Sequence, residues 1–239
     1  MRRLISLTLL TIVALGVVVC FVGGHFGAEG AKQAGELTND TVNFGRYYDS
    51  HGLQENGAAN IVASVVVNYR GFDTLGEVTV LFIAAVGLAA VLYTRPAKAA
   101  TTQAQPASLI LFTGCRFLFP LILLLGAYIF IHGHLTPGGG FQGGAVVASG
   151  FLLIYLGCPA RRLRRTGLNT SESLSGLAFV GVGLIGLAVG GSFLLNLLPK
   201  GTLYSLFSGG VIPVIYVAIG FKVGSELGGI IHDLSGEAQ

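Results

Sequence analysis

The feature that most constrains this chain is a series of apolar segments, each about as long as a lipid bilayer is thick. A helix needs roughly 20 apolar residues to cross the hydrocarbon core, and inside that core it satisfies its own backbone hydrogen bonds. Only 10% of the 239 residues are charged, against about 25% in soluble domains. We therefore predict an all-α integral membrane protein with six transmembrane helices. The predicted spans cover residues 4–24, 73–93, 107–131, 141–157, 174–196 and 207–229.

The positive charges between the spans predict how the chain crosses the membrane, because Lys and Arg concentrate in short cytoplasmic loops. With six spans and both termini in the cytoplasm, eight of these residues lie inside and four outside. The inside group is Arg2, Arg3, Arg95, Lys98, Arg161, Arg162, Arg164 and Arg165, and the outside group is Lys32, Arg46, Arg70 and Lys200. A crossing by the short apolar stretch 60–69 would invert this distribution. We therefore predict that 57–70 forms a short helix that does not span the membrane.

The sequence also divides into two parts. Residues 1–95 hold two predicted spans and a polar outer loop. The first span is longer than the apolar core of a signal peptide, so we interpret it as a retained helix. Residues 96–106 form a linker without an apolar period, and residues 107–239 hold the other four spans. The two parts do not resemble each other, which argues against the internal repeats that build many stand-alone transporters.

The glycine-rich stretch HGHLTPGGGFQGG, residues 132–144, contains the G-x-G-x-x-G spelling of a dinucleotide-binding turn. Such a turn needs a preceding strand and an acidic residue about 20 positions further on. Here a predicted membrane helix precedes it, and arginines stand at that distance. A cofactor is therefore not predicted. His132 and His134 stand two positions apart and point in different directions on a helix, so no metal site is predicted either. We predict a structural hairpin in which Pro137 ends the third span and Gly140 and Gly144 begin a small-residue packing face on the fourth.

Charged side chains inside the predicted spans are the strongest candidates for a functional site. A charge at the centre of a membrane helix costs on the order of 2.5–3.5 kcal/mol, so each needs a partner charge, water or another subunit. Asp73 and Glu77 stand four residues apart in the second span, and Lys222 and Glu226 form a similar pair in the sixth. We assign Glu77 to ion translocation. Asp73 is either a helix N-cap or part of the same route, and Lys222 either lines an ion path or forms a structural ion pair with Glu226.

Three further residues near membrane depth have weaker signals. Arg116 does not release its proton, which favours a structural role. Pro120 lacks the N–H that would bond the carbonyl group of residue 116, so a kink is predicted there. His132, at the outer end of the third span, is a candidate proton relay near neutral pH.

The remaining reactive residue types predict no catalytic site. The three cysteines, Cys20, Cys115 and Cys158, lie in or at the ends of apolar segments. Each is predicted to be a small buried hydrophobic residue rather than part of a disulfide framework. No Ser/His pairing or metal-ligand cluster is spaced for an intramembrane enzyme. We therefore predict that the chain is not an enzyme by itself.

Two motifs resemble a known family. NYRGFDTLGEVTVLFIAAVG, residues 68–87, is similar to the C-terminal membrane segment of the large A subunit of Mrp-type Na⁺/H⁺ antiporters. HGHLTPGGGFQGGAVVASGFLL, residues 132–153, resembles the signature of the B subunit, and the four spans of 107–239 match that subunit throughout. The fusion of both in one polypeptide departs from the separate B subunit. It is similar to the organisation of membrane-bound hydrogenase-type complexes.

The resemblance implies a membrane subunit of a multisubunit cation/proton antiporter module that moves Na⁺ and H⁺. In that family, acidic residues of the R-G-F-D-T-x-x-E segment are thought to line an ion route, and these are Asp73 and Glu77 here. The main pumps of the family lie in other subunits. The expected partners are therefore other membrane subunits and the lipid bilayer of a prokaryotic cell membrane, and no nucleic acid. Two alternatives stay open, an ion-pumping arm of a ferredoxin-linked hydrogenase or related respiratory complex, and a purely structural subunit.

Overall fold

The computed structural model describes residues 15, 44–93, 107–158 and 163–237. The predicted first span, 4–24, is outside the described residues except for Leu15, and the 96–106 linker is wholly outside them. The chain forms two compact units, Met1–Ser50 and His51–Gln239. Every regular element in the described part of the chain is a helix, so the all-α prediction is confirmed there.

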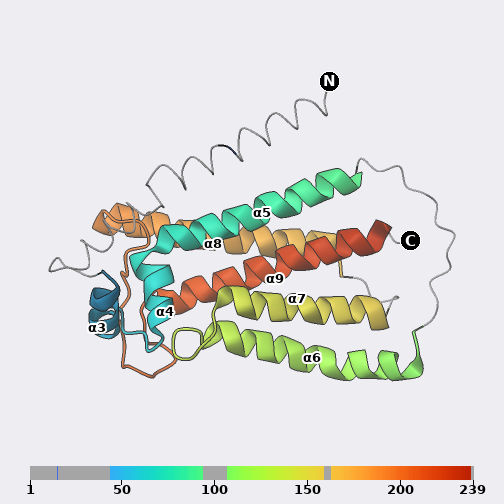
Figure 1. Cartoon of the computed structure of the whole chain (residues 1–239), viewed down its shortest axis with the longest axis horizontal. Coiled ribbons are helices and arrows are strands. Elements are labelled where there is room, and N and C mark those ends of the chain that lie inside the picture. Colours follow the sequence, from blue (N-terminus) through green and yellow to red (C-terminus); the bar gives the residue numbers. More distant parts are fainter. Residues whose placement is uncertain (1–14, 16–43, 94–106, 159–162, 238–239) are drawn as a thin grey trace. The chain divides into compact units, whose positions relative to one another are not determined.

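Five long helices dominate the second unit, and all are long and apolar enough to cross a membrane. They are α5 Gly71–Tyr93, α6 Leu109–Ile131, α7 Gly140–Gly157, α8 Arg165–Gly190 and α9 Ile212–Glu237, and a shorter helix, α3 Phe44–Asn56, precedes them in the chain. The five long helices run side by side, and α9 packs against each of the other four (Figure 1). The buried share of the most apolar stretch is 67% for α9 and only 6% for α5. α9 is therefore the centre of this bundle, and α5 presents most of its surface outward.

The last two predicted spans were wrong at their ends. α8 begins at Arg165 rather than 174 and ends at Gly190. In its polar first turns the Thr170 hydroxyl group donates to the Thr166 carbonyl group, so this side chain makes its hydrogen bond within the helix. The helix stops because Gly191 takes a left-handed conformation with φ 75°. α9 begins at Ile212 rather than 207, which places Pro213 in the first turn, where a proline is tolerated.

The short helix predicted over 57–70 is present as two joined pieces. α4 covers Ile61–Ala63, and the π-helix η1 covers Ser64–Tyr69. Asn60 caps α4 by accepting a hydrogen bond from the Val62 N–H at 3.1 Å. At Arg70 the backbone turns, with φ −126°, and α5 follows. This piece is too short to be a candidate span, in agreement with the prediction.

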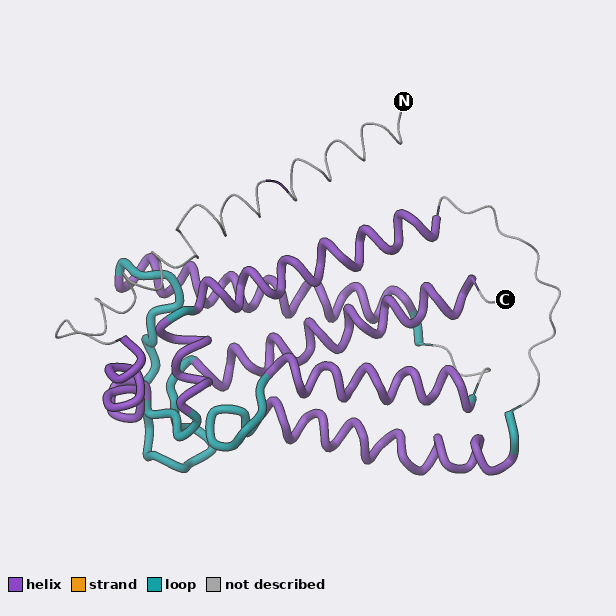
Figure 2. Tube along the Cα trace, in the orientation of Figure 1, coloured by secondary structure: helices purple, strands orange, loops and turns teal. Residues whose placement is uncertain are grey.

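The loop between α6 and α7 lies at the same end of the bundle as α4 and the 191–211 segment (Figure 2). α6 ends at Ile131, with His132 as its C-cap. Pro137 therefore does not end the helix as predicted, but lies in the loop. The turn is fixed instead by hydrogen bonds, because the Asn60 side chain donates to the carbonyl groups of Gly133 at 2.8 Å and Thr136 at 3.1 Å.

Small residues let α7 approach α9 closely. A Cβ atom added to Gly140 would lie 2.5 Å from Cβ of Ile219, and one added to Gly144 would lie 2.8 Å from Cβ of Val223. Ala148, one turn further on, is also buried. Because atoms cannot approach this closely without displacement, the two glycines set the distance between these helices.

Candidate functional site

Three charged side chains meet where α8 and α9 pack together. Nζ of Lys222, on α9, lies 3.1 Å from Oε1 of Glu172 on α8 and 3.2 Å from Oε2 of Glu226, one turn further along α9. The same ammonium group lies 4.9 Å from the centre of the Phe82 ring on α5. Three helices therefore contribute to one site, which we call the Lys222 cluster (Lys222, Glu172 and Glu226).

The Lys222 cluster is largely shielded from solvent. The side chains of Lys222 and Glu226 are 10% and 1% exposed, and that of Glu172 is 21% exposed. With all three groups ionised, one ammonium faces two carboxylates, and the cluster carries one net negative charge. Oε1 of Glu226 has no hydrogen-bond partner among the described residues. A buried carboxylate oxygen without a partner is unfavourable, so this is the position in the cluster that can take up a proton.

Serine side chains extend this polar contact between the helices. Oγ of Ser225 donates to Oγ of Ser171 at 2.7 Å, which joins α9 to α8 next to the charged residues. Both serines also line a cavity of about 380 Å³, whose other lining residues come from α6, α7, α8 and α9 and are apolar. The charged cluster thus adjoins a partly open cavity between these helices.

Glu77 and Asp73 do not join this cluster. α5 turns Thr74 and Val78 into the bundle, whereas Glu77 and Asp73 are exposed. Asp73 forms an ion pair with Arg70 at 2.6 Å, and both side chains are largely exposed. Asp73 lies in the first turn of α5. Of the two predicted pairs of charged residues, only Lys222 and Glu226 on α9 are in direct contact.

The other predicted residues also lie apart from the Lys222 cluster. His132 stacks on Tyr128, with ring centres 4.3 Å apart, and its Nδ1 lies 3.1 Å from the Tyr128 carbonyl oxygen. Arg116 is exposed on α6, where its guanidinium lies 5.5 Å from the centre of the Phe112 ring. No carboxylate in the described part of the chain forms an ion pair with Arg116. Pro120 lies inside α6.

Sequence reasoning missed Glu172 because the start of the fifth predicted span was placed too late, at residue 174. The buried positions of α8 carried a usable signal. Leu168, Ser175, Phe179, Gly183 and Gly186 recur mostly every three or four residues. Glu172 occupies the vacant place in that pattern, between Leu168 and Ser175, and so lies on the face that packs inward.

His134 was weighed only as a metal ligand, but it is fully buried. Its carbonyl oxygen accepts a hydrogen bond from the Asn60 N–H at 3.0 Å. Its ring nitrogens have no hydrogen bond of normal geometry within the described residues. Burial lowers the pKa of His134 below its ordinary value, and the nearby carbonyl groups of Ser205 and Leu206 reduce that shift in part. His134 therefore lies buried inside the turn, where desolvation favours the neutral imidazole.

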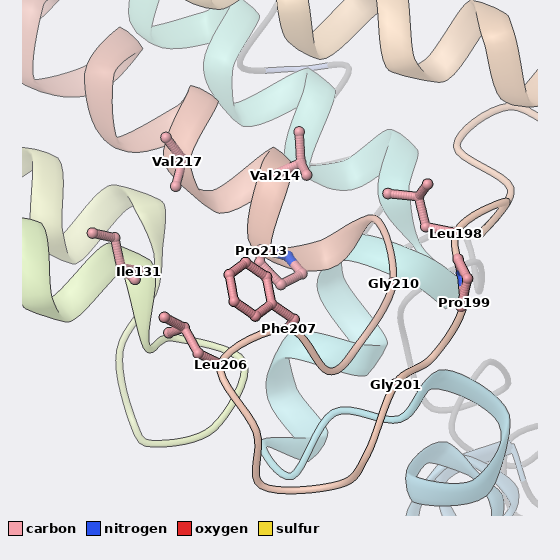
Figure 3. A pocket seen from close by; sticks show the side chains of 10 residues that line it. All are labelled: Ile131, Leu198, Pro199, Gly201, Leu206, Phe207, Gly210, Pro213, Val214 and Val217. Atoms are coloured by element: carbon pink, nitrogen blue, oxygen red, sulfur yellow. The ribbon is translucent and has the colours of Figure 1, made fainter.

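A second, larger cavity has a different character. It has a volume of about 600 Å³ and lies between the end of α6, the 191–211 segment and the start of α9 (Figure 3). Its lining residues are Ile131, Leu198, Pro199, Gly201, Leu206, Phe207, Gly210, Pro213, Val214 and Val217. Since no side chain in this lining is ionisable, the cavity offers no acid–base chemistry. The described residues also contain no group of three metal-ligating side chains.

Four apolar helices around a central α9, with charges buried between them, define a multi-pass helical membrane protein. Residues 110–229, about half of the chain, match the family model described as a domain related to the MnhB subunit of Na⁺/H⁺ antiporter. The chain belongs to this family. Residues 34–107 match a second family, described as the E subunit of MBH. These matches confirm the resemblance carried by the two sequence motifs.

Relatives and solved structures extend the comparison. The chain is 32% identical over 133 residues to the probable K⁺/H⁺ antiporter A/B protein of Rhizobium meliloti, covering 46% of this chain but only 13% of that one. It is 30% identical over 193 residues to an uncharacterized protein of Methanocaldococcus jannaschii, covering 69% and 72% of the two chains. A chain of the archaeal membrane-bound sulfane sulfur reductase is 45% identical with a TM-score of 0.71, and 98% of each chain is covered. A chain of the Mrp complex from Dietzia sp. DQ12-45-1b is 27% identical with a TM-score of 0.67, covering 100% of this chain and 26% of that one.

Proposed function

We propose that this chain is a membrane subunit of a multisubunit cation/proton antiporter module, and that the Lys222 cluster is a proton-exchanging step in its translocation path. The observation that carries the proposal is the burial of two carboxyl groups and one ammonium inside a bundle of membrane-spanning helices. Ionisable groups at this depth are expensive and mark ion paths and proton relays. The family match gives such a path a place in a cation/proton antiporter.

The cluster has the components that a reversible proton site needs. When Glu226 is protonated, Lys222 is neutralised by Glu172 alone. When the proton leaves Glu226, the same ammonium stabilises the new negative charge at 3.2 Å. Lys222 therefore keeps both states of Glu226 accessible, because the cation has a counter-charge in each.

Glu77 and Asp73 are proposed to serve a second part of the path, at a contact with another subunit. α5 carries Glu77 on its exposed face, and the described residues of this chain bury only 6% of its most apolar stretch. A carboxylate on such a helix needs a protein or water-filled partner in the membrane. We propose that a partner subunit covers this face. His132, the C-cap of α6, is proposed as a proton relay at that end of the helix.

The wider organisation belongs to the same proposal. We propose six spans with cytoplasmic termini, in which residues 4–24 form the first. The division into a part over 1–95 and a part over 107–239, joined by the 96–106 linker, is supported by the two family matches on either side of residue 107–110.

A respiratory complex is the second candidate for the parent assembly. The observation that favours it is the near-complete mutual coverage with a chain of the archaeal sulfane sulfur reductase. The antiporter relative from Rhizobium meliloti matches along only a small part of its length. In that case the same module would be the ion-pumping arm of a redox-driven complex.

The test is sodium-dependent proton exchange in inverted membrane vesicles from cells that carry chromosomal variants. Glu226→Gln keeps the shape of the side chain but removes its titration, and we expect it to abolish exchange. The matched control is Arg165→Gln, which breaks the 3.0 Å ion pair to Asp233 between the same two helices near their ends. The control should retain exchange. Normal exchange in Glu226→Gln would remove the cluster from the path.

If the Lys222 cluster has a purely structural role, its variants should change the amount of assembled chain rather than the exchange activity of each copy. Immunoblotting of the same vesicles gives the amount of chain, and exchange is expressed per copy. If the cluster only holds α8 to α9, Glu226→Gln lowers the amount of assembled chain and leaves exchange per copy unchanged. Glu77→Gln is analysed in the same way, with the exposed Thr79→Val on α5 as its control.

A further inference from the structure

Two cysteine side chains meet where α6 packs against α7. Sγ of Cys115 on α6 lies 2.8 Å from Sγ of Cys158, the C-cap of α7, although 43 positions separate them in the sequence. Both are buried, with exposed fractions of 0% and 3%. The sequence predicted two unrelated hydrophobic residues, because nothing in their spacing indicates a contact. The pair lies outside the Lys222 cluster and takes no part in the proposed ion path.

The backbone at the end of α7 is what brings the sulfur atoms together. A Cβ atom on Gly157 would lie 2.6 Å from Sγ of Cys115 and 2.8 Å from its Cβ. Only a residue without a side chain therefore allows this approach. The Cys158 N–H donates to the Ile154 carbonyl at 2.8 Å, which fixes the position of Cys158 at the helix end.

The local hydrogen bonding leaves the two sulfur atoms facing each other. Sγ of Cys115 lies 3.2 Å from the Phe112 carbonyl oxygen, to which it donates its proton. Its lone pairs are then free to face Cys158. A disulfide requires the sulfur atoms to be about 2.05 Å apart. Bond formation here needs the two sulfur atoms to approach each other by less than about 1 Å.

We propose that Cys115 and Cys158 are a redox-active pair that forms a reversible disulfide when the cell meets peroxide. In a reducing cytoplasm the pair persists as two thiols. The modification is a property of the α6–α7 contact and does not depend on which ions the complex moves.

Hydrogen peroxide oxidises the cysteine pair in two steps. A thiolate of the pair attacks one oxygen of hydrogen peroxide, the O–O bond breaks, and a sulfenic acid forms while hydroxide leaves and is protonated to water. The second thiolate then attacks the sulfenic sulfur, the S–S bond forms, and the S–O bond breaks to release a second water. In sum, two thiols and one peroxide give one disulfide and two waters. A dithiol reductant returns the disulfide to two thiols by supplying two electrons and two protons, and is itself oxidised to a disulfide.

The cross-link closes the α6–α7 pair at its open end. The loop 132–139 already joins the helices at the other end, so the disulfide converts the hairpin into a closed ring. A closed ring has fewer unfolded conformations. We therefore expect the oxidised form to melt at a higher temperature than the reduced form.

The test uses the full chain in its own membranes, in a Cys20→Ser background that removes the third cysteine. Membranes are treated with hydrogen peroxide or with dithiothreitol, denatured, alkylated with N-ethylmaleimide, and digested for mass spectrometry. The expected result is a peptide linking residues 115 and 158 after peroxide, and two alkylated cysteines after the reductant. Two alkylated cysteines after peroxide, or sulfinic acid without a linked peptide, would overturn the proposal.

Two variants test whether the geometry is the cause. Gly157→Ala keeps both cysteines but places a methyl group against Cys115, and we expect the linked fraction to fall several-fold. Gly181→Ala on α8 is the matched control, because a Cβ atom there meets nothing within 4 Å. A linked fraction in Gly157→Ala equal to that of the control would show that the helix approach is not what positions the sulfur atoms.

Discussion

Lys222 on α9 and Glu172 on α8 form an ion pair at 3.1 Å, although 50 residues separate them in the sequence. The pair joins the central helix of the bundle to its neighbour, and Glu226 completes it from the adjacent turn of α9. The three charged groups therefore lie on two helices rather than on one. The stability of the α8–α9 contact should depend on all three groups.

Lys222→Leu should destabilise the chain more than the loss of any exposed ion pair. It leaves two largely buried carboxyl groups beside each other without a cation, which costs about 3–5 kcal/mol in a buried pair. Arg165→Gln, which breaks the partly exposed pair to Asp233, should cost at most about 1 kcal/mol. The measurement is the apparent melting temperature of the chain in detergent-solubilised membranes. Adding Glu226→Leu to Lys222→Leu should recover part of the loss, and equal melting temperatures for the two single variants would contradict this account.

The helix boundaries show how much of the fold could be predicted from the sequence. The lengths of the apolar segments predicted the ends of α5, α6 and α7 to within two residues. The boundary between apolar and polar residues is sharp there. The prediction failed at α8, where hydroxyl side chains and a run of polar residues continue the helix beyond its apolar part. Glu172 was lost with that boundary. The Cys115–Cys158 and Asn60–Gly133 contacts depend on helix packing and on loop conformation, neither of which a one-dimensional pattern records.

Gly144→Val should weaken the contact between α7 and α9. The added Cβ atom would lie 2.8 Å from Cβ of Val223 and 2.9 Å from the Gly220 carbonyl oxygen. Because backbone lies on one side of this contact, the helices must separate, and overpacking of this kind costs about 1–3 kcal/mol. The apparent melting temperature should fall, while Gly181→Ala, which meets nothing within 4 Å, should leave it unchanged. A Gly144→Val chain as stable as the control would show that the two helices are not held at this distance by the glycine.

Asn60→Ala should loosen the loop between α6 and α7. The Asn60 side chain donates to the Gly133 and Thr136 carbonyl groups and accepts from the Val62 N–H, so one residue serves three partners. Leaving such groups unpaired costs about 1–3 kcal/mol. We expect faster hydrogen exchange of the amides of residues 133–139, measured by mass spectrometry on the solubilised complex. The exposed Asn169→Ala on α8 is the control, and unchanged exchange in the loop after Asn60→Ala would argue against this anchoring role.

His134 should make the stability of the same loop depend on pH. Its pKa in the folded chain is lowered from 6.5, chiefly by burial, and the nearby His132 adds to the shift when it is charged. At a pH between the lowered value and 6.5, the unfolded chain therefore binds a proton that the folded chain does not. Stability then rises with pH in this window. The contribution is fully present above the unfolded pKa of 6.5 and decreases as the pH falls below it.

His134→Gln removes this titration while keeping a polar side chain of similar size. The apparent melting temperature of the wild-type chain should fall as the pH is lowered from about 7 to about 5, and the slope should be smaller in the variant. The exposed His51→Gln serves as the control and should keep the wild-type slope. The measurement is a series of thermal denaturation curves on solubilised membranes at constant ionic strength. Parallel curves for the wild-type chain and His134→Gln would mean that His134 is not the group whose neutral form the fold requires.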